Sequence, residues 1–147
     1  MSRSAELLFL FKRDFELLRK ELKQFSPEEK LWQVTGSITN SAGNLTLHLC
    51  GNLRHYIGAI LGGSSYVRNR EAEFSITNFP LSILLQLIDE TERELEYAFQ
   101  KLSNAGLEKV FPLEVLNRKW ITETFIIHLY GHFNYHLGQI NYLRRVL

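Results

Sequence analysis

Residues 122–145 read TETFIIHLYGHFNYHLGQINYLRR and carry the clearest pattern in this chain of 147 residues. They predict the last helix of the protein, and the cationic Arg144 and Arg145 suit its C-terminal end, where the helix dipole is negative. Three histidines recur along it at steps of four residues: His128, His132 and His136. Side chains four residues apart on a helix lie one above the other, so this helix presents a column of imidazoles.

Three more long helices are predicted upstream. The first has Ser4 as its N-cap and an apolar face that recurs at steps of three and four residues: Leu7, Leu8, Phe11, Phe15, Leu18, Leu22 and Phe25. A short helical turn is expected after Ser26-Pro27 and through Trp32. The second long helix is expected over about 41–61, with Asn40 or Ser41 as its cap, and the third over about 80–103.

Four long helices and no convincing strand indicate an all-α fold, a four-helix bundle with at least one long crossover connection. The whole chain, residues 1–147, is expected to form a single domain. Residues 64–78 are predicted to be a polar connection, residues 104–106 to stop the third helix, and residues 107–120 give no clear pattern. Three glycines inside the second helix, at 43, 51 and 58, predict that something packs or binds close to its backbone.

Composition narrows the classes of function. Lys and Arg number 17 and Asp and Glu 16, a formal charge of +1, so no strong net field attracts nucleic acid or an anionic membrane. Cys50 is the only cysteine, which excludes an internal disulfide and a cysteine-based zinc site. The apolar patch at 7–11 is too short to span a membrane. We therefore expect a cytoplasmic protein with no nucleic-acid or membrane partner.

The histidines are the candidate functional residues. Two imidazoles four residues apart can share one metal ion, and both 128/132 and 132/136 have this spacing. His128 and His136 lie about 12 Å apart along the axis, so all three cannot bind one ion and a further ligand must come from another helix. His48, in an apolar stretch of the second helix, is the natural candidate. Three neutral imidazoles would leave an open coordination position, which is typical of catalytic rather than structural sites.

The same histidines also admit a reading without metal, in which they are packed core residues. His55 lies seven residues after His48 and is given a structural or supporting role. His128 is interpreted as a supporting or core residue rather than a ligand. Cys50 lacks any local signature of a catalytic thiol, and a buried free cysteine is common.

Residues 131–140, GHFNYHLGQI, resemble the last helix of the DinB/YfiT-like superfamily, which reads roughly H-x-x-H-H-R-G-Q. The first and third histidines of that pattern bind metal, and they correspond to His132 and His136. Residues 40–53 resemble the family's second helix, whose histidine is the third ligand and corresponds to His48. The family's middle histidine is Tyr135 here and its arginine is Leu137, so its substrates are not carried over.

The resemblance implies a four-helix bundle with a divalent metal, most often zinc or nickel, that forms a homodimer and acts on a small-molecule substrate with a low-molecular-weight thiol. On this basis we expect a metal-dependent thiol S-transferase or hydrolase. The alternative is a non-catalytic, metal-binding bundle that works by dimerising. The candidates for orienting the ligands or the substrate are Gln139, Asn44, Tyr135 and His128. Arg68 and Arg70 are candidates for binding an anionic group of the substrate, and the simpler alternative is that they belong to a solvated, ion-paired loop.

Overall fold

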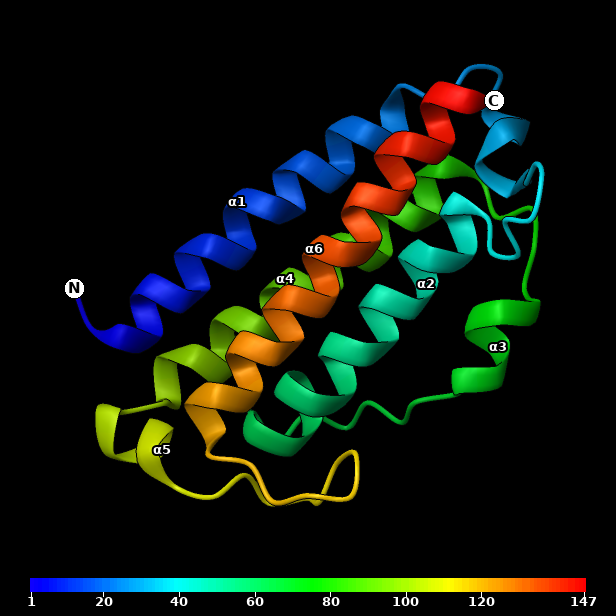
Figure 1. Ribbon diagram of the computed structural model, residues 1–147. Helices are drawn as coiled ribbons and strands as arrows, with labels where there is room; N and C mark the ends of the chain where they lie inside the picture. The colour runs from blue at the N-terminus through cyan, green and yellow to red at the C-terminus, as the bar shows by residue number, and fades with distance from the viewer.

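The computed structural model describes residues 1–147 and consists of helices joined by loops, with no strand (Figure 1). This confirms the predicted all-α fold. The helices are α1 (Arg3–Lys23), the 3-10 helix η1 (Glu28–Trp32), α2 (Ala42–Leu53), the π-helix η2 (Arg54–Leu61), α3 (Arg70–Ser75), α4 (Leu81–Lys101), α5 (Asn104–Glu108) and α6 (Thr122–Val146). No helix combines the length and the apolar character that crossing a bilayer requires.

The bundle is formed by α1, α2 with its continuation η2, α4 and α6. Helices α1 and α2 each pack against both α4 and α6. Figure 1 shows that α2 and α4 run in the same direction, so residues 62–80 return along the length of the bundle and carry α3 on the way. This return is the expected long crossover.

The core consists of the apolar faces that the residue spacing predicts. Phe11, Phe15, Leu18 and Leu22 of α1 are buried, and so are Leu45, Leu49 and Leu53 of α2 and Ile57 of η2. Each fully buried side chain of this size contributes roughly 1.5–3 kcal/mol. The T-shaped contact of Phe15 with Phe133, with ring centroids 5.2 Å apart, joins α1 to α6.

The glycines of the second helix do meet close neighbours, as predicted. A Cβ atom on Gly43 would lie 2.7 Å from the Trp32 ring, and one on Gly51 would lie 1.9 Å from Glu73 Oε2. One on Gly58 would lie 2.6 Å from Glu94 Oε2. Helix α2 and its continuation η2 therefore form a surface onto which η1, α3 and α4 each place one side chain.

Several local predictions were wrong. Ser2, not Ser4, caps α1 with its side chain, and Ser4 is buried within the helix. The stretch 104–106 does not simply end the third helix: Ser103 caps a new short helix, α5, there. The connection 64–78 contains α3, whose N-cap is Asn69. Helices of five or six residues are too short to repeat an apolar face, and the prediction of a helix from sequence depends on that repeat.

Candidate metal centre

Three histidines from two helices meet on one side of the bundle. His48 comes from α2, and His132 and His136 come from successive turns of α6. Their ligand atoms all lie within 4.8 Å of one another. The Nε2 atom of His132 lies 3.1 Å from Nε2 of His48 and 3.1 Å from Nε2 of His136. Nitrogens on one tetrahedral zinc lie roughly 3.3 Å apart, so the spacing suits a shared ion.

A buried carboxylate fixes the ring of His48. The Nδ1 atom of His48 lies 3.0 Å from Oε1 of Glu73, which is 5% exposed. Arg68 holds the same carboxylate with two hydrogen bonds, from Nε at 2.8 Å and Nη2 at 2.9 Å. Burial alone would raise the pKa of Glu73, but hydrogen bonds from His48 and Arg68 outweigh it and lower the pKa. A carboxylate only accepts, so Nδ1 of His48 carries the proton and Nε2 keeps its lone pair.

A carboxamide one turn along α6 fixes His136. The Nδ1 atom of His136 lies 2.7 Å from Oε1 of Gln139, which accepts the hydrogen bond. The Nε2 atom of His136 therefore also keeps its lone pair. Such partners on the far nitrogen are the usual support of metal-bound imidazoles.

His132 lies between the other two rings. Burial, followed by the proximity of His136 and His48, lowers its pKa to about 4, so the ring is neutral at pH 7. Its Nδ1 is buried and has no hydrogen-bond partner. Its Nε2 faces two lone pairs and can donate a proton well to only one of them. Hydrogen bonding within the histidine trio (His48, His132 and His136) is thus incomplete, whereas one divalent cation would engage all three Nε2 atoms.

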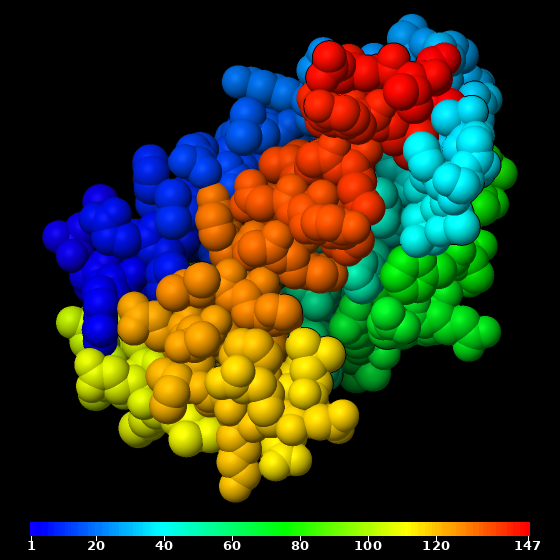
Figure 2. All heavy atoms as spheres, in the orientation of Figure 1, coloured from blue at the N-terminus to red at the C-terminus, as the bar shows by residue number.

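Two cavities border the histidine trio. The one we call the Asn52 cavity, of about 250 Å³, is lined by His48, Asn52 and His132 among others. Figure 2 shows the surface hollowed where α6 meets the loop after α5 and the segment after η2. A second cavity of about 560 Å³ is lined by His136 and Gln139 and by apolar residues of α6. A small molecule could therefore approach the trio from either side.

Of the other candidates, Gln139 and Arg68 lie at the centre and the rest lie further out. The Nδ2 atom of Asn44 donates to the backbone oxygens of Glu73 and Ile76, so Asn44 anchors α3 rather than orienting a ligand directly. Tyr135 is 66% exposed and meets His136 edge to face. Arg68 is a half-buried ion-pair partner of Glu73, not a free anion site.

Two histidines, His128 and His55, lie outside the trio. His128 packs against Trp120 and Phe125, with ring centroids at 5.0 and 5.8 Å. His55 contacts Tyr56, with ring centroids 4.7 Å apart. Cys50 is buried, and burial raises its pKa to about 11, so its thiol is not a nucleophile at neutral pH.

Two residues of this region, Glu73 and Asn52, were not predicted from the sequence. Gly51 could have indicated Glu73, because a glycine in mid-helix implies a close neighbour. Asn52 could have been found from its place four residues after His48, on the same face of α2.

Comparison with known proteins gives one match. The model of a family described as "Protein of unknown function (DUF1572)" matches residues 5–147. No curated protein and no solved structure matches the chain.

Proposed function

The chain belongs to the DUF1572 family, whose function is unknown, and from this premise we propose that it is a metal-dependent enzyme of the thiol S-transferase or hydrolase type. His48, His132 and His136 would hold one divalent ion. Imidazole ligands accept several such ions, and the resemblance to the DinB/YfiT-like superfamily favours zinc or nickel. The observation that carries the proposal is the convergence of three Nε2 atoms, two of them held by hydrogen bonds at Nδ1. The DinB/YfiT-like pattern in residues 132–139 supports the same ligands.

An open coordination position favours catalysis over a purely structural site. The group of potential ligands contains three histidines and no fourth histidine, cysteine or carboxylate. A divalent ion with an open position lowers the pKa of a bound water or thiol. The protein's own part is to keep Glu73 and Gln139 against the two outer imidazoles and to admit a small molecule through the adjoining cavities.

Cobalt substitution tests both the site and its openness. We expect Co²⁺ to bind the wild type and its absorption spectrum to change when 2-mercaptoethanol is added, with a new sulfur-to-cobalt band. H132A should show neither signal, and H55A, which replaces a histidine that lines neither cavity beside the trio, should behave as the wild type. A bound cobalt spectrum that responds neither to thiol nor to pH would contradict an open site and favour the non-catalytic bundle. Light scattering tests whether the chain forms the homodimer that we also propose.

A further inference from the structure

Asn52 is a buried polar side chain that the protein leaves without a partner. It is 7% exposed, and its Oδ1 atom is fully enclosed with no hydrogen-bond partner. Buried side-chain amides are normally paired, because losing water without gaining a partner costs free energy. Asn52 lies one turn after His48 on the same face of α2 and lines the Asn52 cavity. The Nδ2 atom of the same carboxamide forms no hydrogen bond and, unlike Oδ1, is not fully enclosed, so it is free to donate to a molecule in that cavity.

The charge of the Asn52 cavity favours an anion. No carboxylate lines it, whereas Arg68 and Arg70 do. The charge of Arg68 is balanced by Glu73. Arg70 is exposed, forms no ion pair, and lies with its guanidinium 5.4 Å from the centre of the Phe74 ring. One positive charge at the rim thus remains uncompensated. The rest of the wall is largely apolar: Tyr56, Val115, Leu116, Phe125 and Leu129.

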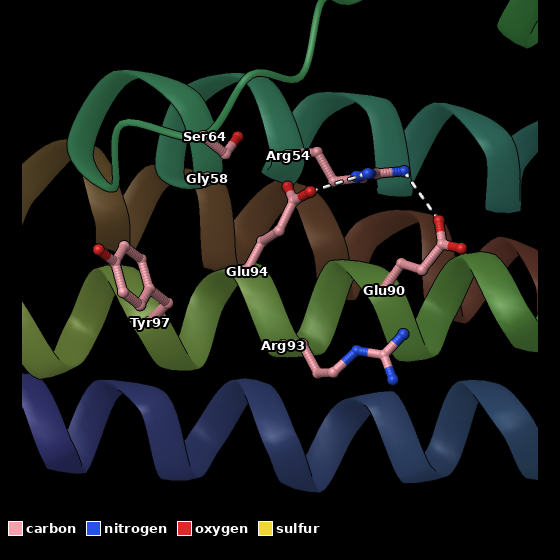
Figure 3. A pocket seen from close by; sticks show the side chains of 7 residues that line it. All are labelled: Arg54, Gly58, Ser64, Glu90, Arg93, Glu94 and Tyr97. Carbon is pink, nitrogen blue, oxygen red and sulfur yellow. Dashed lines mark hydrogen bonds and ion pairs between the residues drawn. The ribbon is translucent and has the colours of Figure 1, made fainter.

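A cavity of nearly equal size, about 260 Å³ between η2 and α4, provides the contrast (Figure 3). There Arg54 is paired with Glu90 at 3.3 Å and with Glu94 at 2.7 Å. The guanidinium charge of Arg54 is therefore already neutralised by Glu90 and Glu94. These two carboxylates line the same cavity and would repel an incoming anion. Arg93 lines that cavity without an ion pair and so supplies a matched control for Arg70.

We propose that the Asn52 cavity binds a small organic carboxylate with an apolar body. Arg70 pairs with the carboxylate, Asn52 donates a hydrogen bond through its Nδ2, and the apolar body packs against Tyr56 and Phe125. That the Asn52 cavity is a substrate site beside the histidine trio rests on the proposed function. The binding chemistry itself requires no metal.

Calorimetric titration with benzoate, and with benzamide as its uncharged analogue, tests this in metal-free and in zinc-loaded protein. We expect benzoate to bind the wild type in both forms and benzamide to bind roughly tenfold more weakly. R70Q and N52L should each weaken benzoate binding by a similar factor, and R93Q should leave it unchanged. R70Q replaces an exposed residue, so its result does not depend on refolding of the core.

Three outcomes would overturn the inference. The first is equal binding of benzoate and benzamide, and the second is no binding of benzoate. The third is benzoate binding that requires zinc and is indifferent to R70Q and N52L, because the carboxylate would then be held by the metal. That third outcome leaves the proposed metal site intact. Conversely, benzoate binding that depends on Arg70 and Asn52 in a protein unable to bind zinc would support the inference while the proposed function fails.

Discussion

Helix α6 carries two polar clusters on opposite faces, and they are satisfied to very different degrees. Toward α1, the fully buried Asp14 carboxylate accepts hydrogen bonds from the Tyr130 hydroxyl, from Asn134 at 3.0 Å and from Arg13 at 2.8 Å. Toward α2, the histidine trio brings three Nε2 atoms together and leaves the Nδ1 of His132 unpaired.

The difference separates structure from function within one helix. A cluster whose donors and acceptors match holds two helices together and has no need of a further partner. A cluster of facing acceptors is complete only when something else binds. We therefore interpret the Asp14 cluster (Asp14 with Arg13, Tyr130 and Asn134) as structural and the histidine trio as a ligand site. Variants of the histidine trio should therefore lose metal binding, whereas variants of the Asp14 cluster should lose stability and keep metal binding.

The largest effect is expected from zinc itself. At a free zinc concentration 1,000 times Kd, the wild type should gain about 4 kcal/mol of unfolding free energy, because only the folded chain assembles the site. H132A should gain none, while H55A should gain as much as the wild type. Urea unfolding with and without zinc measures this difference. Equal stabilisation of H132A would show that zinc binds elsewhere.

The Asp14 cluster should show the reverse behaviour. D14A leaves the Tyr130 hydroxyl and the Asn134 amide without their acceptor, and we expect a loss of about 3 kcal/mol in unfolding free energy. Zinc affinity should stay unchanged, because the cluster lies on the other face of α6. Urea unfolding together with zinc titration checks both halves. A D14A protein that folds but binds zinc much more weakly would mean that the two clusters are coupled.

A smaller effect is expected from the partner of His48. E73Q retains a hydrogen-bonding side chain but loses the charge, and we expect zinc affinity to fall 10–100-fold, or about 2 kcal/mol. E71Q, two residues earlier on the exposed face of α3, is the control and should match the wild type. Competition with a chromogenic chelator gives the affinities. Unchanged affinity in E73Q would reduce Glu73 to a purely structural anchor of α3.

The two clusters should lose their contributions to the unfolding free energy in different pH ranges. A single titrating group changes that free energy by at most about 1.4 kcal/mol per pH unit. The pKa of His132 is lowered from 6.5 to about 4, mainly by burial, so the unfolded chain binds its proton first. In metal-free protein this contribution is lost as the pH falls from 6.5 towards 4.

Asp14 acts in a lower pH range. Burial would raise its pKa, but hydrogen bonds from Arg13, Tyr130 and Asn134 lower it below 3.8. Its contribution is therefore present above pH 3.8 and is lost as the pH falls below that value. H132A should flatten the upper part of the stability curve and D14N the lower part. Identical curves for the wild type and H132A would contradict the burial of a neutral His132.

The sequence was most informative where a pattern repeats along one element. The four long helices follow from apolar residues at steps of three and four. The step of four between histidines fits 128/132 as well as 132/136, and the resemblance to the DinB/YfiT-like pattern is what selected His132 and His136 together with His48. What was missed depends on contacts between elements. Helix α3 is only six residues long and is held by Asn44 and by the ion pairs of Glu73, which no local pattern encodes. The incomplete bonding of Asn52 is likewise a property of the folded protein.

The metal content of protein purified without a histidine tag tests the central claim most directly. Elemental analysis should find about one divalent ion per chain in the wild type and in H55A, and none in H48A, because His48 is the only ligand from α2. An empty wild type that takes up neither added zinc nor nickel would contradict the account, and so would an H48A variant that keeps its metal.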